Sequence, residues 1–187
     1  MKVSIILPAY NRAHTISRAI KSILEQSYEN FELLCIDNGS IDDTRNVVKA
    51  KGDKRLKYFY YDERKGAGAA RNYGITLAKG ELIAFMDSDD EWLEDKLDKQ
   101  VRILSKNKKI DLVYSDMWWV PLSREPMYHV APDVSSAYII NADTHLYQVY
   151  LIGIQSIIVK RDCLDGAGKF REDMSCFEDM EFLIRLQ

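Results

Sequence analysis

Short runs of apolar and β-branched residues recur along the first part of the chain, and amphipathic patterns fill most of the gaps. Apolar residues spaced three and four apart predict one helix at 16–24 and another at 93–104. Alternation of short strands with helices is typical of a parallel sheet that is covered by helices. The expected strands are residues 3–7, 31–36, 56–61, 82–86 and 112–114.

The alternation stops after Asp116, where the sequence becomes irregular and contains several prolines. A further strand is expected at 156–159 and a last helix at 178–187. Because that helix reaches the final residue without a C-cap signal, we expect the chain to have been cut from a longer one. The sequence contains no Gly/Ser-rich linker, repeat or low-complexity tract, so one domain is expected.

The composition narrows the class of protein. A chain of 187 residues with 47% apolar and 29% charged residues is typical of one globular domain with a real core. Its net charge of -3 argues against a nucleic-acid partner, which would favour a basic surface. Three widely spaced cysteines indicate reduced thiols in a cytoplasmic protein, and no apolar run approaches the ~20 residues of a membrane span.

An acidic cluster directly follows the apolar run at 82–86. It consists of Asp87, Ser88, Asp89 and Asp90. Like charges this close repel one another, so a folded cluster gains from a cation, and oxygen ligands favour magnesium or manganese over zinc. The same residues also fit a helix start, with Ser88 as N-cap and Glu91 three residues later in a capping box. Taken alone, the cluster is compatible with both interpretations.

Polar or unusual residues follow four of the predicted strands. Ligands of parallel sheets bind at the carboxyl ends of the strands. We therefore expect these strand ends to converge on one rim of the sheet, which favours the metal interpretation of the acidic cluster. The segments are 8–11, 37–40, 62–66 and 87–89.

Two residues within or near these segments each allow two interpretations. Arg71 follows closely spaced glycines, so it either pairs with an anion or is a solvated residue in a glycine-rich helix start. Asp37 either holds the ribose or base of a nucleotide or belongs to an ordinary Asp-Asn-Gly turn. The segment after the first strand lacks glycine, which argues against a dinucleotide-binding fold.

The C-terminal segment contains another candidate carboxylate. Ser175 and Glu178 fit a capping box, which gives Glu178 a structural role. Asp179 would then be the fourth helical residue and would lie on the apolar stripe of Phe182 and Leu183. A carboxylate on such a stripe suggests a general base, although an acidic residue in a first helical turn also suits the helix dipole.

Five ordered segments resemble family 2 glycosyltransferases. They are 4–11 (SIILPAYN), 37–40 (DNGS), 68–72 (GAARN), 87–90 (DSDD) and 178–179 (ED). The resemblance implies the GT-A fold, an α/β, Rossmann-like and mostly parallel sheet flanked by helices, in a single domain over residues 1–187. It further implies that residues 1–116 form the nucleotide-binding half and that 117–187 begin the acceptor-side half.

The resemblance also implies roles for single residues. Asp89 matches the ligand of a divalent metal ion, Mn²⁺ or Mg²⁺, and Asp179 matches the catalytic base. The other matched positions are assigned to the nucleotide-sugar donor: Pro8, Ala9, Tyr10 and Asn11 in the first loop, Asp37 at the base, Arg71 near the nucleotide, and Asp87 at the ribose, followed by Ser88.

The implied reaction is an inverting transfer of a sugar from a nucleotide-sugar donor, in most members a UDP-sugar, to a hydroxyl group. The expected acceptor is a carbohydrate or a lipid-linked molecule in the synthesis of bacterial-type polysaccharides or glycoconjugates. Two other classes stay open: a non-catalytic nucleotide-sugar binding module and a nucleotidyltransferase. We expect a cytoplasmic protein without a transmembrane segment, and work at the inner face of the membrane is compatible with this.

Overall fold

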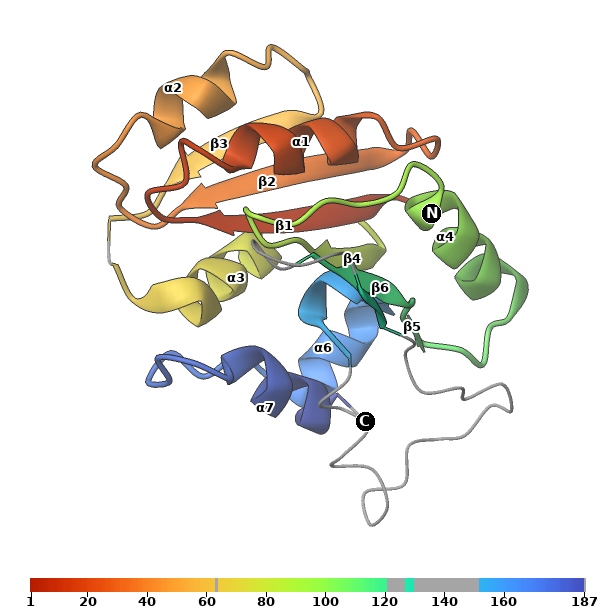
Figure 1. The fold of residues 1–187 in the computed structure, drawn as a ribbon. Coiled ribbons are helices and arrows are strands. Elements are labelled where there is room, and N and C mark those ends of the chain that lie inside the picture. Colours follow the sequence, from red (N-terminus) through yellow and green to blue (C-terminus); the bar gives the residue numbers. More distant parts are fainter. Residues whose placement is uncertain (63, 121–126, 130–151, 187) are drawn as a thin grey trace.

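The structure is a computed structural model that describes residues 1–62, 64–120, 127–129 and 152–186 (Figure 1). Its main sheet has the strand order β3-β2-β1-β4-β8-β5. The strands β1 to β4 pair in parallel, whereas β8 runs antiparallel to both β4 and β5. The predicted α/β fold with a mostly parallel sheet is thus confirmed. The strands are β1 (Val3–Ala9), β2 (Phe31–Asp37), β3 (Leu56–Tyr60), β4 (Leu82–Phe85), β5 (Leu112–Val113) and β8 (Ile158–Lys160).

Helices cover both faces of this sheet because successive side chains on each strand point to opposite faces. Ile5 of β1 packs in one buried cluster and its neighbour Ile6 in the other. The first cluster includes apolar residues of α1 (Ile16–Leu24), α2 (Thr44–Lys49) and α4 (Lys96–Lys106). The second includes those of α3 (Gly66–Leu77), α6 (Arg161–Ala167) and α7 (Glu178–Arg185). Figure 1 shows the two helical layers on either side of the strands.

The remaining elements lie after α4. β6 (Met117–Trp119) and β7 (Met127–His129) form a separate antiparallel pair. A short 3-10 helix, η1 (Ile154–Ser156), leads into β8. Much of the expected acceptor-side half, 117–187, lies outside the described residues.

The helix-start interpretation of Ser88, one of the two left open, is wrong. The chain after β4 forms no helix until α4 begins at Lys96, and Ser88 is buried rather than placed at a helix end. The apolar spacing places Leu93 on the buried stripe of this helix, but Leu93 precedes α4 and is 70% exposed. The local pattern of hydroxyl and carboxylate residues therefore does not decide where this helix starts.

The capping box predicted at Ser175 is also wrong. Phe177, not Ser175, is the N-cap residue of α7, and it has a left-handed backbone with φ 62°. Glu178 and Asp179 are accordingly the first and second residues of the helix, and Asp179 is not the fourth. The left-handed conformation is uncommon for a bulky residue and indicates that the surrounding structure imposes it.

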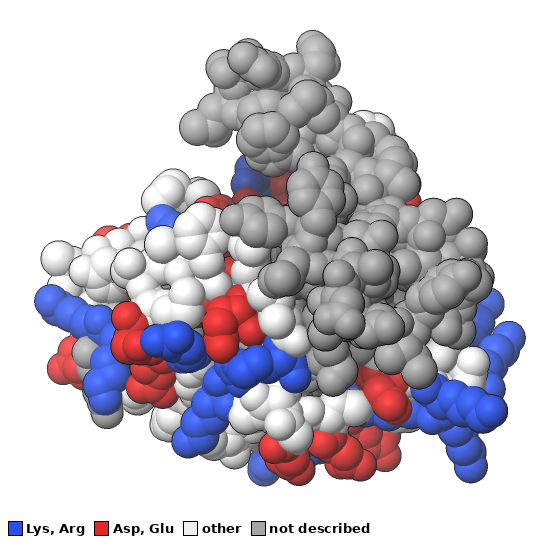
Figure 2. Space-filling model, turned by 90° about the horizontal axis from the view of Figure 1, so that it is seen from below, with Lys and Arg blue, Asp and Glu red and all other residues white. Residues whose placement is uncertain are grey.

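Among the described residues, no helix has the length and apolar character that crossing a membrane requires. Figure 2 shows the face that contains α7, where Lys and Arg alternate with Asp and Glu outside the grey atoms.

Candidate active site

A cavity of about 600 Å³ lies at the carboxyl ends of the parallel strands. All four strand ends that the sequence predicts to converge contribute to it, so this prediction is confirmed. The residue Glu63 of the third segment lies outside the described residues. The lining residues are Pro8, Ala9, Tyr10, Arg12, Asn38, Arg64, Gly66, Ala67, Ala70, Arg71, Asp87, Ser88 and Asp89.

The segment after β1 forms one wall of this cavity. Pro8 and Ala9 end the strand, and Tyr10 follows with 45% of its surface exposed. Asn11 does not line the cavity. Its backbone is left-handed, its N–H donates to the Ser40 hydroxyl at 2.8 Å, and its side-chain oxygen accepts from the Ile41 N–H at 2.9 Å. Asn11 therefore ties the first loop to the turn after β2.

Asp37 ends β2 beside Ala9 but is absent from the cavity lining. One carboxylate oxygen accepts from the Ser40 N–H at 2.8 Å, as in an Asx turn, and the other accepts from the Tyr58 hydroxyl at 2.5 Å. Burial and this hydrogen bond raise the pKa of Tyr58 above its ordinary value, which keeps the hydroxyl a donor. The turn interpretation is confirmed, and the neighbouring Asn38 is the residue of this turn that faces the cavity.

Arg71 lies on α3 with only 3% of its surface exposed. The glycine-rich segment does begin a helix, but the alternative in which Arg71 is solvated is wrong. Its guanidinium donates to Asp87 at 2.8 Å and to Glu178 at 2.7 Å. Burial lowers the pKa of Arg71, but the two carboxylates outweigh this and raise it above its ordinary value, so the residue stays cationic.

The carboxylates of the acidic cluster lie in different environments. Asp87 is partly buried against Arg71, whereas Asp89 is exposed at the cavity and has Arg12 at 3.9 Å as an ion-pair partner. Burial raises the pKa of Asp90 to about 6, and the charges of Asp87 and Asp89 add to the effect. The three carboxylates of the cluster thus differ in burial and in the cation beside them.

Asp179 is partly buried on α7 and does not line the cavity among the described residues. Its oxygen accepts from the Met180 N–H at 2.9 Å. Phe182 and Leu183 of the same helix are buried as predicted, and Glu178 joins them beside Arg71.

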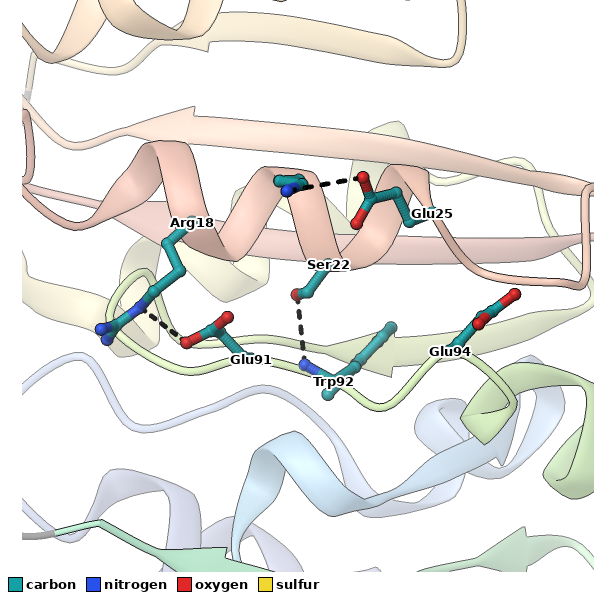
Figure 3. Close-up of a pocket in the computed structure, with 7 residues that line it drawn as sticks. Arg18, Ser22, Glu25, Glu91, Trp92 and Glu94 are labelled. Carbon is teal, nitrogen blue, oxygen red and sulfur yellow. Dashed lines mark hydrogen bonds and ion pairs between the residues drawn. The ribbon is translucent and has the colours of Figure 1, made fainter.

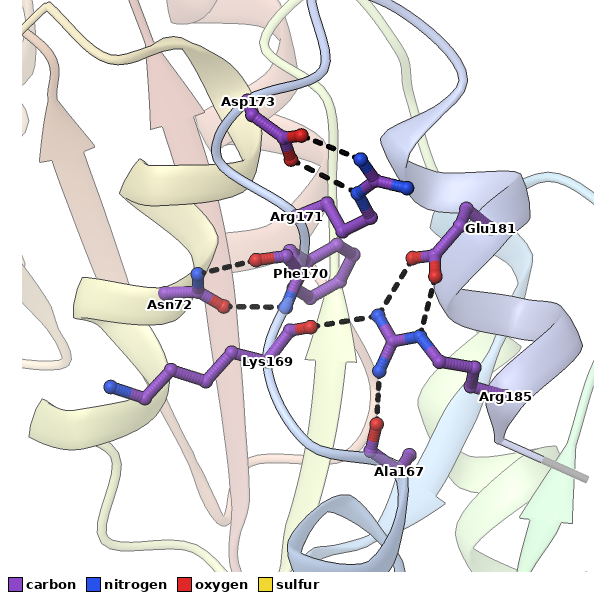
Figure 4. Close-up of polar contacts among 8 residues, drawn as sticks. All are labelled: Asn72, Ala167, Lys169, Phe170, Arg171, Asp173, Glu181 and Arg185. Atoms are coloured by element: carbon purple, nitrogen blue, oxygen red, sulfur yellow. Dashed lines mark hydrogen bonds and ion pairs between the residues drawn. The ribbon is translucent and has the colours of Figure 1, made fainter.

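Two sets of polar contacts hold the segment around α7 in place (Figure 4). Asn72 of α3 donates to the Phe170 carbonyl at 2.9 Å and accepts from the Phe170 N–H at 2.8 Å. Arg185 pairs with Glu181 at 2.7 Å and also donates to the carbonyls of Ala167 and Lys169. The pair is thus part of a tertiary clamp between α7 and the end of α6.

Similarity to known proteins identifies the family of this chain. The family model described as Glycosyl transferase family 2 matches residues 4–121, which is more than half of the chain. The chain belongs to this glycosyltransferase family.

Two curated relatives illustrate the relationship. The chain is 46% identical over 114 residues to the Escherichia coli UDP-Glc:alpha-D-GlcNAc-diphosphoundecaprenol beta-1,3-glucosyltransferase WfgD, covering 61% of this chain and 45% of that protein. It is 39% identical over 104 residues to a putative teichuronic acid biosynthesis glycosyltransferase, TuaG, of Bacillus subtilis, covering 54% and 41%. The chain thus spans less than half the length of these two relatives.

Two solved structures share the fold. TarS of S. aureus in complex with UDP-GlcNAc has a TM-score of 0.84 and 24% identity, covering 99% of this chain and 53% of that one. The mannosyltransferase PcManGT of Pyrobaculum calidifontis, with GDP-Man and Mn²⁺, has a TM-score of 0.69 and 22% identity, covering 95% and 50%. These likenesses establish the GT-A glycosyltransferase fold for the chain.

The acidic cluster offers carboxylate oxygens, which are the ligands that Mg²⁺ and Mn²⁺ prefer. Within the described ranges, no group of three or more His, Cys, Asp or Glu side chains is arranged to hold a metal ion. Asp89 is exposed at the cavity, so its carboxylate is the group of this cluster that could hold such an ion.

Sequence reasoning missed several residues of the cavity, among them Arg12, Asn38 and Arg64. Each lies within or next to one of the strand-end segments that the sequence indicated. Their position at a strand end, and not a motif, could have identified them as cavity residues. Among the described residues, four buried side-chain polar atoms have no hydrogen-bond partner. Two of them belong to this cavity, namely Oδ1 of Asn38 and Nε of Arg71. Such atoms are uncommon and concentrate where a ligand binds or strain is stored.

A second cavity of about 440 Å³ lies between α1 and the loop after β4 (Figure 3). Arg18 pairs with Glu91 at 2.8 Å across it, and the Trp92 N–H donates to the Ser22 hydroxyl at 3.1 Å. These contacts attach the loop that contains Asp89 to α1.

Proposed function

We propose that this protein is a metal-dependent, inverting glycosyltransferase that moves a sugar from a UDP-sugar to a hydroxyl group of a lipid-linked or carbohydrate acceptor. The observation that carries the proposal is the cavity that gathers Tyr10, Arg71, Asp87 and Asp89 at the carboxyl ends of β1 and β4 in a chain of this family. Ligands of parallel sheets bind at this edge.

Several relatives support the choice of donor. The name of WfgD specifies UDP-Glc, and TarS was crystallised in complex with UDP-GlcNAc. The exposed Tyr10 and the amide of Asn38 provide the flat and polar surfaces that a nucleotide requires. Asp87, with one oxygen held by Arg71, keeps a second oxygen that can accept from a ribose hydroxyl.

The chain's own groups have distinct tasks in the proposed reaction. Asp179 takes the proton of the acceptor hydroxyl, whose oxygen attacks the anomeric carbon while the bond from that carbon to the diphosphate oxygen breaks. Attack from the opposite face inverts the configuration, and the nucleoside diphosphate leaves. Asp89 would hold a divalent metal that, when bound, neutralises the negative charge of the departing diphosphate. Arg12 lies close enough to Asp89 to add positive charge there.

We further propose a place for the reaction at the cytoplasmic face of the membrane. The name of WfgD specifies a diphosphoundecaprenol-linked acceptor, and that of TuaG specifies teichuronic acid biosynthesis. Because UDP-sugars are present in the cytoplasm, the enzyme would bind a lipid-linked acceptor at the inner surface of the membrane. We expect the domain division at residues 116 and 117 to separate donor from acceptor contacts.

Calorimetry with UDP and Mn²⁺ tests the donor half of the proposal. We expect UDP to bind more tightly with Mn²⁺ than without it, and Asp89→Ala to abolish this difference. Asp98→Ala serves as the matched control, because Asp98 is an exposed carboxylate paired with Arg102 on α4. If the affinity for UDP is the same with and without Mn²⁺, and the same in Asp89→Ala as in the wild type, the metal site is wrongly assigned.

Transfer assays with Asp179→Asn test the catalytic half. Loss of a general base lowers the rate by about 10²- to 10⁴-fold. Asp162→Asn is the control, since Asp162 is the second residue of α6 just as Asp179 is the second residue of α7. A protein that binds the donor but never transfers sugar to any acceptor would instead be a non-catalytic binding module.

A further inference from the structure

Arg71 connects two parts of the chain that have different tasks. Its two terminal nitrogens contact Asp87, which follows β4 at the donor cavity, and Glu178, which begins α7, the helix of the proposed base. Glu178 is separated from Arg71 by 107 positions in the sequence. Each terminal nitrogen of the guanidinium thus holds a protein carboxylate, so Arg71 bridges two carboxylates instead of leaving its fork open to an anion.

The bridge rests on a rigid aromatic layer. Arg71 lies over the ring of Phe170, at 5.5 Å from its centroid. Phe170 stacks on Phe182 of α7 with centroids 3.8 Å apart, and both rings meet Phe85 of β4 edge-on. All three aromatic residues are almost completely buried. Close-packed interiors transmit displacements, so a shift of the β4 end cannot leave α7 unaffected.

The same face of α3 holds the segment before α7 closely. Asn72, the neighbour of Arg71, brackets Phe170 with two hydrogen bonds. One turn earlier, a Cβ added at Gly68 would lie 2.9 Å from the Arg171 carbonyl and 3.3 Å from Glu178. The absence of a side chain at Gly68 therefore allows the approach that brings Glu178 to Arg71.

We propose that Arg71 and Glu178 are positioning residues that couple donor binding at Asp87 to the placement of α7 and its base, Asp179. This rests on the proposed function, since it takes Asp87 to contact the donor. A donor hydroxyl that engages Asp87 changes its hydrogen bond with Arg71, and Arg71 passes this change to Glu178. Donor binding thereby holds the base-bearing helix more firmly in place, which limits attack before the site is fully assembled.

Hydrogen exchange of the wild-type chain, with and without UDP and Mn²⁺, tests the coupling directly. We expect UDP to slow exchange of the α7 amides by about fivefold or more, the lower end of usual couplings between sites. UDP that binds without any change in α7 overturns the inference while leaving the donor site intact. UDP that does not bind at all contradicts the proposed function instead.

Two carboxylate variants on α7 separate the Arg71 link from general loosening of the helix. Glu178→Gln should bind UDP within about threefold of the wild type but lose the UDP-dependent protection of α7, because the coupling energy is removed. Glu181→Gln, which breaks the clamp to Arg185 on the same helix, should retain it. Equal loss in both variants would show that Arg71 has no special role, and melting curves verify that each variant is folded.

Discussion

The guanidinium of Arg18 donates a hydrogen bond to the backbone carbonyl of Asp89 at 2.8 Å. A second nitrogen of the same side chain contacts Glu91 at 2.8 Å. One arginine of α1 thus holds the backbone of the proposed metal ligand and the side chain two residues later. Because the side chains of Arg18 and Glu91 are more than half exposed, this pair contributes little to global stability.

Arg18→Ala should therefore weaken metal-dependent UDP binding and leave the fold intact. Without the hydrogen bond to its carbonyl, Asp89 samples more positions, and we expect the affinity for UDP with Mn²⁺ to fall by about 3- to 10-fold, since a typical net hydrogen bond contributes about 1 kcal/mol. Calorimetry measures the affinity. Arg102→Ala removes an exposed arginine paired at 2.9 Å on α4 and should have no such effect. Equal affinities in wild type and Arg18→Ala would show that the loop is held by other contacts.

Glu32→Gln should destabilise the protein. Glu32 is almost completely buried at the opposite end of the sheet, where it accepts from Ser4, Lys57 and the Lys79 N–H at 2.7 to 2.8 Å. Loss of the charge weakens these bonds and should lower the free energy of unfolding by about 1–3 kcal/mol. Urea denaturation measures this. The control Glu25→Gln, in an exposed pair with Lys21, should stay within about 0.5 kcal/mol of the wild type.

The same residue predicts an acid dependence of stability. Burial raises the pKa of Glu32, but the hydrogen bonds from Lys57, Ser4, Lys79 and Lys2 outweigh this and lower it from 4.5 to about 2. The folded state therefore binds this proton less readily than the unfolded state. Its contribution to stability is complete above pH 4.5 and is lost as the pH falls toward 2. The difference between wild type and Glu32→Gln should shrink over that interval, and a constant difference would contradict the assignment.

Lys96→Met should stabilise the protein at neutral pH. Lys96 is buried at the first position of α4, and its ammonium lies over the Trp92 ring at 4.2 Å and donates to Gln100 at 2.6 Å. Burial lowers its pKa from 10.5 to about 7. Replacing a buried charge by an apolar side chain of similar length is often stabilising by about 1 kcal/mol or more.

The sign of the pH dependence follows from the lowered pKa of Lys96. Between pH 7 and 10.5 the unfolded chain binds this proton and the folded chain does not, so stability rises with pH across this interval. Below pH 7 both states bind the proton and the slope from Lys96 vanishes. Lys96→Met should remove the rise, whereas Lys99→Met, at an exposed position of the same helix, should retain it. Melting temperatures measured from about pH 6 to 10 test both expectations.

The sequence predicted the sheet because local patterns decide its strands. Alternation places Ile5 and Ile6 on opposite faces, and both are fully buried, as expected for a sheet covered on both sides. The polar residues after each strand predicted the cavity for the same reason. Topology then brings these strand ends to one edge without any further information from the sequence.

The roles of other residues depend on tertiary contacts that the local sequence pattern does not predict. Ser88 and Glu178 both fit capping boxes, yet Ser88 is buried beside the cavity and Glu178 pairs with Arg71 from the far end of the chain. The pattern around a carboxylate contains no information about a cation 107 positions away. The sequence pattern likewise did not predict that β8 lies antiparallel between β4 and β5, because this pairing joins segments that are far apart in the chain.

Two glycines provide a test of how closely α3 packs on the sheet. A Cβ added at Gly74 of α3 would lie 2.5 Å from one side-chain carbon of Ile6 and 3.3 Å from Ile36, both of which are fully buried. Although alanine is the better helix former, Gly74→Ala should lower the free energy of unfolding by about 1–3 kcal/mol through overpacking. Gly166 of α6 has nothing within 4 Å of its added Cβ, so Gly166→Ala should instead raise it by about 0.5–1 kcal/mol. Urea denaturation of both variants measures the two effects, and a stabilised Gly74→Ala would show that α3 can shift away from β1.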